Sequence, residues 1–187
     1  AGLVVVAVAA FCWVKFAYQP AVAEAQGQMA LAEENFRAAD YELALNGDGN
    51  VLGFAQIIDE YGAKAGMAAN FYAGVCELQL GEWEQAIKYL ENYSSKDAIL
   101  AARATACLGD AYVGLEDYGK ALGYFEKAAA TADNMYAATY LLKAGLVAEK
   151  LGEDQKALSF YKTIKDQYPQ SMEGYDIDKY IGRIEAK

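Results

Sequence analysis

The chain has 187 residues, of which 55% are hydrophobic, 26 acidic and 16 basic, and it has no histidine and a formal net charge of -10. The acidic excess argues against nucleic-acid binding, which depends on Lys and Arg at the phosphates, and the missing histidine removes the commonest general base and zinc ligand. The length suits one ordinary domain, and the hydrophobic content excludes an intrinsically disordered chain.

The first predicted element is an apolar segment at the N-terminus. No charged side chain occurs from Ala1 to Val14, and Lys15 is followed by further aromatic residues. A helix that crosses a bilayer needs about 20 apolar residues, and aromatic rings at its end suit the membrane surface. We therefore predict a partial transmembrane segment over residues 1–18. Its predicted membrane-anchor residues are Leu3, Val4, Val5, Val6, Val8, Phe11, Trp13 and Tyr18.

Two alternatives stay open for this segment. Ala21-Val-Ala23 before Glu24 has the small-residue pattern of a signal-peptide cleavage site, and an apolar run of this length can also form a buried core helix. Between residues 19 and 61 Arg37 is the only basic residue, against eight acidic ones. By the positive-inside rule, this scarcity of basic residues favours a non-cytoplasmic location for the rest of the chain.

Residues 19–63 are predicted to form a linker helix and a divergent helical hairpin. Apolar spacing predicts one long helix over 26–45 and a shorter one over 52–61, with Asn-Gly-Asp-Gly-Asn at 46–50 between them. That stretch lacks the spaced carboxylates and the bidentate glutamate of a calcium loop. We therefore interpret it as a tight turn.

Internal repetition begins after residue 63. Three segments each contain a glycine, an alanine 12 residues later and a bulky side chain four residues beyond that, and the glycines are 35 and 36 residues apart. Apolar residues at three- and four-residue steps predict two helices in each segment, and such hairpins must stack to bury their apolar faces. The three sets are Gly74, Ala86 and Leu90; Gly109, Ala121 and Phe125; and Gly145, Ala157 and Tyr161.

The turns and the end of the repeats are also predicted from local signals. Gly81 and Gly152 are predicted to end the first helices of their hairpins, with Glu-Asp-Tyr at 116–118 as the corresponding turn. Pro169 marks the end of the third hairpin. Ser171 is predicted to cap a last amphipathic helix within residues 170–187, which closes the stack with a polar face.

These segments resemble the tetratricopeptide repeat family, whose pattern W-x2-L-G-x2-Y, A-x3-F is matched by Leu108-Gly109, Tyr112, Ala121 and Phe125. No segment has the tryptophan of this pattern. The resemblance implies an all-α fold, a solenoid of antiparallel helical hairpins preceded by an N-terminal, truncated transmembrane helix. It places three repeats within 64–169, at about 67–101, 102–137 and 138–169.

The family resemblance further implies a concave groove that holds a peptide or helix of a partner protein, lined by the first helix of each repeat. The groove-facing positions are predicted to grade from apolar to mixed basic along the chain, without the basic clamp that some family members use for chaperone C-termini. In the alternative, the N-terminal helix covers the apolar end of the groove. The predicted groove residues are Phe71, Tyr72, Val75, Leu78, Arg103, Ala106, Asp110, Val113, Thr139, Leu142, Lys143, Leu146 and Lys150.

Catalytic and metal-binding patterns are absent from the sequence. It has no glycine-rich phosphate loop and no C-x-x-C pair, and its carboxylates are scattered. We interpret Cys12, Cys76 and Cys107 as small buried or lipid-facing residues. We therefore expect no enzymatic activity, no cofactor and no metal site.

The order of a membrane segment, a degenerate hairpin and three repeats is similar to the bacterial ancillary Sec-translocon subunits (YfgM-like). That resemblance implies a single-pass protein of the bacterial inner membrane with its soluble domain in the periplasm. It would be a scaffold in the cell envelope that binds translocon components, periplasmic chaperones or their clients. The alternative is a structural subunit of an envelope or outer-membrane assembly complex.

Overall fold

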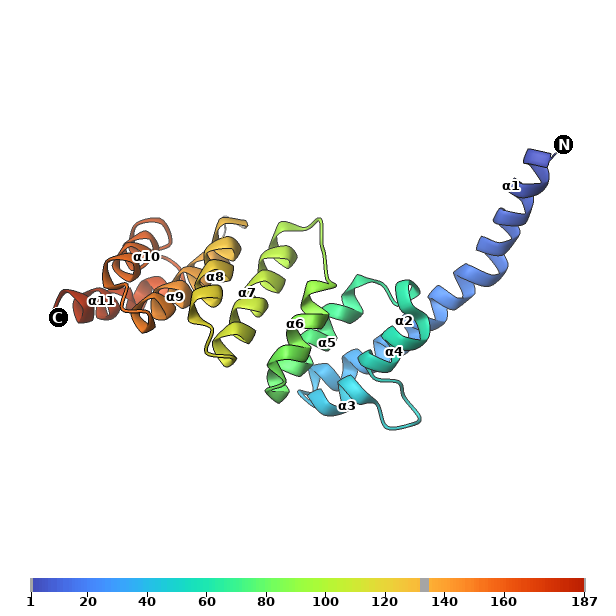
Figure 1. The fold of residues 1–187 in the computed structure, drawn as a ribbon, viewed down its shortest axis with the longest axis horizontal. Coiled ribbons are helices and arrows are strands. Elements are labelled where there is room, and N and C mark those ends of the chain that lie inside the picture. The colour runs from blue at the N-terminus through green and yellow to red at the C-terminus, as the bar shows by residue number, and fades with distance from the viewer. Residues whose placement is uncertain (1, 132–134, 187) are drawn as a thin grey trace. The chain divides into compact units, whose positions relative to one another are not determined.

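The computed structural model describes residues 2–131 and 135–186, and all regular secondary structure in these ranges is helical, as predicted (Figure 1). The chain divides into two compact units, Ala1–Glu82 and Trp83–Lys187, and each is described by itself below. The division falls inside the first predicted repeat. Residues 132–134 of the second predicted repeat lie outside the described residues.

Unit 1 begins with one continuous helix. It consists of α1 (Gly2–Trp13), a π-helical turn (Val14–Tyr18) and α2 (Gln19–Arg37), and the junction residues Trp13 and Gln19 keep right-handed helical dihedral angles. The apolar side chains of its first part are exposed, and the first buried side chain along the helix is Ala25. The interpretation of this segment as a buried core helix is therefore wrong.

The prediction of one helix over 26–45 is also wrong, because the helix ends at Arg37 and a new one begins at Tyr41. Ala39 adopts a left-handed conformation with φ of 61°, and the Asp40 carboxylate caps the next helix by accepting a hydrogen bond of 3.2 Å from the Leu43 N–H. Asparagine and aspartate favour such helix starts. The break folds the chain back, so that α2 packs against the next helix. The remaining elements of unit 1 are α3 (Tyr41–Asn46), α4 (Phe54–Tyr61), a 3₁₀ turn (Gly62–Lys64) and α5 (Met67–Leu80).

The predicted tight turn at 46–50 is confirmed. The Asp48 carboxylate accepts hydrogen bonds from the N–H groups of Asn50 and Val51, at 2.8 and 2.9 Å, and Gly47 and Gly49 have positive φ. The hydrogen bonds from Val51 and Asn50 lower the pKa of Asp48. This is the geometry of an Asx turn, in which the carboxylate is satisfied by the backbone of its own loop.

An aromatic cluster forms the core of unit 1 around Tyr72 on α5. Its ring is stacked on Phe54, with centroids 5.0 Å apart, and meets the edge of Phe36 at 5.1 Å. Phe54 and Phe36 come from α4 and α2, so the cluster joins three helices. Buried aromatic side chains of this size dominate the energetics of small cores.

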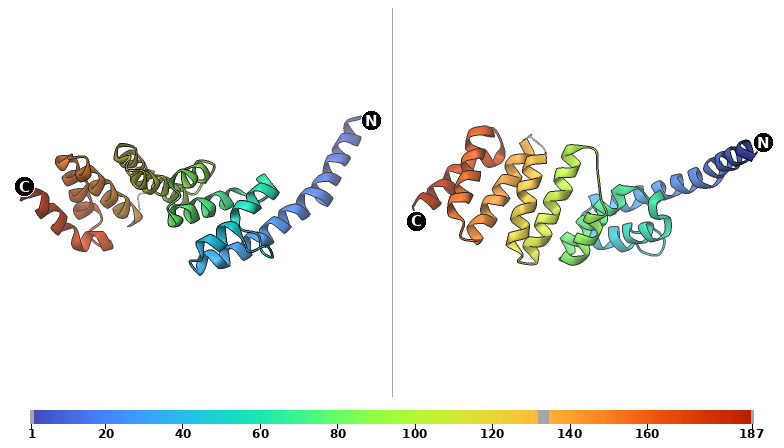
Figure 2. Two further views of the ribbon diagram at one scale, coloured as in Figure 1. Left: turned by 60° about the horizontal axis from the view of Figure 1, so that its bottom comes forward. Right: turned by 45° about the horizontal axis from the view of Figure 1, so that its top comes forward.

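Unit 2 is a regular series of helices in which each packs against the next (Figure 2). The connection between the fifth and sixth helices is a short turn after Gln167, where Pro169 lies as predicted. Ser171 caps the last helix as predicted, since its hydroxyl accepts a hydrogen bond of 3.0 Å from the Gly174 N–H. The six helices are α6 (Trp83–Glu91), α7 (Ala98–Gly114), α8 (Tyr118–Thr131), α9 (Met135–Lys150), α10 (Asp154–Gln167) and α11 (Met172–Glu185).

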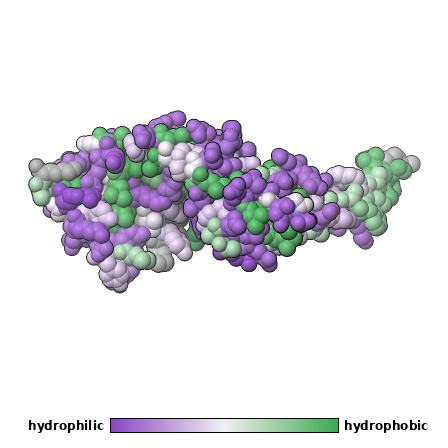
Figure 3. Space-filling model, turned by 90° about the horizontal axis from the view of Figure 1, so that it is seen from below, coloured by the Kyte–Doolittle hydropathy of each residue, from purple (hydrophilic) through white to green (hydrophobic). Residues whose placement is uncertain are grey.

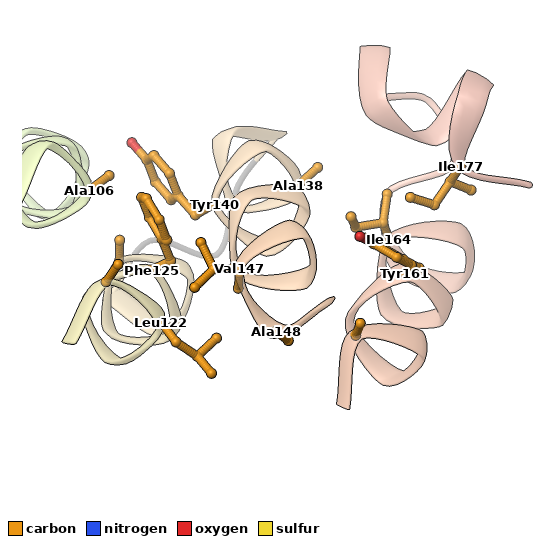
Figure 4. Close-up of a cluster of buried hydrophobic side chains, with 14 of the residues drawn as sticks. Ala106, Leu122, Phe125, Ala138, Tyr140, Val147, Ala148, Tyr161, Ile164 and Ile177 are labelled. Atoms are coloured by element: carbon orange, nitrogen blue, oxygen red, sulfur yellow. The ribbon is translucent and has the colours of Figure 1, made fainter. Parts of the chain in front are cut away.

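The repeated glycines of unit 2 allow an aromatic ring of the next helix to lie against the helix backbone. A Cβ atom on Gly109 would stand 2.6 Å from the ring of Phe125, and one on Gly145 would stand 2.2 Å from the ring of Tyr161. Both rings are buried in the hydrophobic core of the unit (Figure 4). The glycine and the bulky residue 16 positions later are thus in contact, and this contact joins the two helices of one hairpin.

The turns within the repeats share one backbone conformation. Gly81, Glu116 and Gly152 all have positive φ, at 83°, 59° and 77°. After each of them the next N–H reaches back five residues, as in the bond of 2.9 Å from Asp117 to the Tyr112 carbonyl. This is a Schellman motif, and glycine is its preferred residue. The predicted helix ends at Gly81 and Gly152 are confirmed.

The same motif reveals a further hairpin, α2–α3, whose turn lies inside the single helix predicted over 26–45. Ala39 has the left-handed conformation, and the Asp40 N–H bonds to the Asn35 carbonyl at 3.0 Å. Ala32 and Ala44 stand 12 residues apart around this turn and are fully buried, like the glycine and alanine of the other repeats. Ala32 precedes Gly74 by 42 residues, seven more than the 35-residue step, and the loop after α3 accounts for the excess.

Candidate functional site

The strongest candidate surface lies in unit 2 on the helices that begin each hairpin and on the last helix. We define the α7–α9–α11 face by exposed or half-buried side chains on one side of these three helices, most of which recur at a step of 36 residues. The helical period puts residues spaced three and four apart on one side of each helix. The members are Leu100, Arg103, Cys107 and Asp110 on α7; Tyr136, Thr139, Lys143, Leu146 and Lys150 on α9; and Met172, Tyr175, Lys179 and Arg183 on α11.

Polar contacts tie the three helices together across this face. The Lys143 ammonium lies 2.7 Å from each carboxylate oxygen of Asp110, which joins α9 to α7. Thr139 donates a hydrogen bond of 2.6 Å to Glu173, which joins α9 to α11. Lys143 and Asp110 are predicted groove residues that the structure brings together, but their pairing leaves less charge for a ligand.

A second link is built around Glu149 at the other end of α9. Its carboxylate accepts hydrogen bonds from Arg183 at 2.5 Å and from the Tyr161 hydroxyl at 2.7 Å. Burial raises the pKa of Tyr161, and the hydrogen bond to Glu149 and the charge of that carboxylate raise it further. The phenol therefore stays protonated and keeps donating, which connects the core of the hairpin to the surface.

A shallow hollow of about 280 Å³ opens beside this link, lined by Leu146, Glu149, Lys150 and Arg183. Lys150 forms no ion pair with any described residue. Leu146 is exposed and gives the hollow an apolar wall. The hollow suits a small side chain of a partner whose apolar part contacts Leu146 and whose hydrogen-bond acceptor receives a hydrogen bond from Lys150.

Exposed apolar side chains stand in register at the opposite end of the α7–α9–α11 face. Leu100, Tyr136 and Met172 are 45%, 51% and 86% exposed, and they are separated by 36 residues each. We call them the apolar row. Tyr175, one turn after Met172, is exposed as well. Single exposed apolar residues are ordinary, but their recurrence at one position of three helices makes this row a candidate interaction surface.

The predicted groove residues of unit 2 fall into two groups. Ala106 is only 3% exposed and belongs to the hydrophobic core beside Phe125, so it offers no surface to a ligand. Val113 and Leu142 are half-buried and pack against the same core. The remaining predicted residues of this unit are at least partly exposed on the α7–α9–α11 face: Arg103, Asp110, Thr139, Lys143, Leu146 and Lys150.

The predicted groove residues of unit 1 are less accessible. Tyr72 lies in the aromatic cluster with Phe36 and Phe54, so the alternative in which the N-terminal helix covers it describes its position. Phe71, Val75 and Leu78 are half-buried. The sequence offered this cover as an alternative but did not identify Phe36 and Phe54 as the rings that form it, because they belong to no repeat.

The N-terminal part of unit 1 is the second candidate site. The helix over Leu3–Arg37 is long and apolar enough to cross a membrane, and its most apolar part is not buried inside the structure. Hydrophobic residues cover the free end of this helix (Figure 3). All eight predicted anchor residues lie on it, seven of them exposed and Tyr18 half-buried. A signal sequence has the same length and composition, so that alternative stays open.

The cysteine and carboxylate side chains show no cofactor geometry. In the described residues no group of three or more histidine, cysteine or acidic side chains is arranged to hold a metal ion. Burial raises the pKa of Cys76 to about 12 and that of Cys107 to about 11, helped by Glu77 and Asp110 respectively. Such thiols are poor nucleophiles at neutral pH, because the thiolate is the reactive form.

Comparison with known proteins identifies the repeats. Two family models of the tetratricopeptide repeat match residues 108–171 and 68–97, together about half of the chain. A crystal structure of the MamA protein is 18% identical with a TM-score of 0.65, and the match covers 87% of this chain and 86% of that one. Another crystal structure of MamA is 18% identical with a TM-score of 0.63, covering 83% and 92%. At such identities the likeness concerns the fold alone, and a search of curated proteins finds no match. Residues 68–97 and 108–171 are therefore tetratricopeptide repeats.

Proposed function

We propose that this protein is a membrane-anchored scaffold of the bacterial cell envelope that holds a partner protein on its α7–α9–α11 face. The family is one of protein-binding repeats. The observation that carries the proposal is the apolar row, because three exposed apolar side chains in register can contact one elongated partner. The ion-paired middle of the face would fix its orientation, since charged pairs contribute more to specificity than to affinity.

The anchor in this proposal is the exposed apolar helix from Leu3 to Tyr18. Its large apolar side chains from Leu3 to Phe16 are exposed, and burial of such a surface in lipid is favourable. We further propose an inner-membrane location with the repeats in the periplasm. The scarcity of basic residues after the anchor supports this orientation.

The partner in this proposal is a translocon component, a periplasmic chaperone or one of their clients. The support is architectural, namely an anchor followed directly by repeats that bind proteins. A partner that approaches along the α7–α9–α11 face would bury the apolar row and place a side chain in the hollow beside Lys150.

Introducing charged side chains tests the binding surface. Leu100→Arg with Met172→Arg places two charges in the apolar row, while Ala130→Arg with Gln155→Arg places two on exposed positions of α8 and α10. Both variants carry a photocrosslinking residue at Leu146 and are expressed as full chains in membranes. We expect the first pair to abolish crosslinks to envelope proteins and the second to leave them intact.

Two outcomes contradict this assignment. Crosslinks that persist in the Leu100→Arg, Met172→Arg chain exclude the apolar row as the contact. A parent chain that crosslinks only to copies of itself excludes the scaffold and favours a structural subunit of an assembly. Equal thermal unfolding of the two variants ensures that loss of binding is not loss of folding.

A further inference from the structure

The end of unit 1 that lies nearest to the anchor is the turn between α4 and α5. α4 runs antiparallel to α2, because Phe54 at its start lies near Phe36 whereas Tyr61 at its end lies near Glu24. The proximity of Tyr61 and Glu24 is reflected in the pKa of Tyr61, which is raised by burial and then by the charges of Glu24 and Glu60. α5 then runs back toward the aromatic cluster at Tyr72. The turn Tyr61–Met67 is therefore the anchor-proximal tip of unit 1 (Figure 1).

The height of this tip above a bilayer is set by helix geometry. Six residues separate Tyr18, at the end of the aromatic part of the anchor, from Glu24, and at 1.5 Å per residue they span about 9 Å. The headgroup layer on each side of a bilayer is roughly 5–7 Å thick, and tyrosine side chains lie at that level. Because the helix is continuous through α2, no flexible linker separates the tip from the membrane.

Composition at the tip differs from that of the rest of unit 1. No acidic residue occurs from Gly62 to Cys76, whereas residues 19–61 contain eight. Lys64 forms no ion pair with any described residue, and Met67 is 45% exposed among small residues. Glu24 and Glu60 lie on the α2 and α4 side of the tip, so Lys64 and Met67 on the α5 side are the groups suited to lipid.

We propose that the turn Tyr61–Met67 rests on the lipid headgroups, with Lys64 bound to their phosphates and Met67 against the outer side of the headgroup layer. The inference rests on the membrane anchoring proposed above. Lysines near an anionic leaflet are attracted to it, and the acidic remainder of unit 1 is repelled. Unit 1 is thereby held upright on the membrane, with the α2–α3 turn pointing away from it.

Collisional quenching by lipid nitroxides tests this contact. The full chain with Cys12→Ala, Cys76→Ala and Cys107→Ala receives one fluorescently labelled cysteine at a time, by Phe11→Cys, Ala63→Cys or Glu42→Cys. The chain is placed in phosphatidylethanolamine–phosphatidylglycerol vesicles with the nitroxide on the headgroup or on the acyl chain. Glu42 is the matched exposed control. It lies just beyond the end of α2, and that end is about 28 Å from Tyr18 by helical rise.

We expect headgroup nitroxide to quench the Ala63→Cys label several-fold more than the Glu42→Cys label. We expect acyl-chain nitroxide to quench the Phe11→Cys label. Equal quenching at positions 63 and 42, with position 11 quenched, overturns the headgroup contact and leaves the anchor intact. No quenching at position 11 overturns the anchor itself, and this inference with it.

A charge reversal separates the lysine contact from simple proximity. Lys64→Glu is expected to lower headgroup quenching of the Ala63→Cys label in vesicles with phosphatidylglycerol while quenching of the Phe11→Cys label stays the same. Unchanged quenching at position 63 excludes a phosphate contact of Lys64. A far-ultraviolet circular dichroism spectrum equal to that of the parent shows that each chain is folded.

Discussion

The hairpin α2–α3 of unit 1 and the hairpin α7–α8 of unit 2 use the same turn but complete their packing differently. Both place a left-handed residue in the turn and buried small residues 12 apart on the two helices. In α7–α8 the second helix continues and brings Phe125 over Gly109. In unit 1 the second helix stops at Asn46, and Phe54 of α4 fills the core beside Tyr72. The turn and the small pair thus define the hairpin, while the bulky residue can come from a separate helix.

The largest expected loss of stability comes from removing the two bulky rings, Phe54 and Phe125, that complete the packing of these hairpins. Phe54→Ala and Phe125→Ala each remove a buried ring and should lower the free energy of unfolding by about 3–5 kcal/mol. Denaturant titration measures the loss, and hydrogen exchange locates it. We expect faster exchange in α3–α5 for Phe54→Ala and in α7–α9 for Phe125→Ala. The same exchange pattern in both variants would contradict the division into two cores.

The glycine contact is tested by adding a single methyl group. Gly145→Ala places a Cβ where the ring of Tyr161 lies, and overpacking of this kind costs about 1–3 kcal/mol. Gly123→Ala on α8 is the matched control, because no atom lies within 4 Å of its added Cβ. We expect that control to gain up to about 1 kcal/mol from helix propensity. Equal effects at both positions would show that the ring does not need the glycine.

The shared turn conformation predicts opposite effects at equivalent positions. Glu116 holds a left-handed conformation that glycine adopts without strain, so Glu116→Gly should raise the melting temperature. Gly152→Ala should lower it, and each substitution should change the free energy of unfolding by about 1 kcal/mol. Thermal unfolding followed by circular dichroism measures both. A loss of stability for Glu116→Gly would mean that the glutamate side chain contributes more than the backbone strain removes.

A further predicted effect is a loss of stability at alkaline pH. In the folded chain, burial raises the pKa of Cys76 to about 12 and that of Cys107 to about 11. An unfolded cysteine has a pKa of about 8.5. Unfolding therefore releases protons in this window, so the free energy of unfolding falls as the pH rises above about 8.5. Urea titrations between pH 8 and 10 should show this slope, and Cys76→Ala with Cys107→Ala should reduce it. An unchanged slope would assign the loss to other groups.

The sequence predicted the repeats of unit 2 better than it predicted unit 1. The spacing of Gly109, Ala121 and Phe125 survives in the structure because one contact geometry recurs at each step. The hairpin at Ala32 and Ala44 escaped notice because seven inserted residues shift its period and alanine replaces glycine. The aromatic cluster was not predicted, since the 18-residue spacing of Phe36, Phe54 and Tyr72 differs from the 35- and 36-residue step of the repeats.

The candidate surface was predicted in part. Family positions placed Lys143 and Leu146 on it, but they also included Ala106, which is buried because α7 turns that position toward Phe125. The apolar row was not among the groove positions that the family resemblance implied, although the two 36-residue steps from Leu100 through Tyr136 to Met172 are visible in the sequence. Exposure was the missing information, because the pattern alone does not separate a surface row from a buried one.

Membrane extraction tests the central claim, that the exposed N-terminal helix anchors a protein-binding repeat domain. Membranes containing the full chain, or the chain with Val5→Arg and Val8→Arg, are washed with alkaline carbonate and floated on a density gradient. A charge at the centre of a spanning helix costs about 2.5–3.5 kcal/mol on insertion scales. The account predicts that the parent floats with lipid and that the double variant stays in the soluble fraction. A parent chain that is extracted like the variant would contradict it.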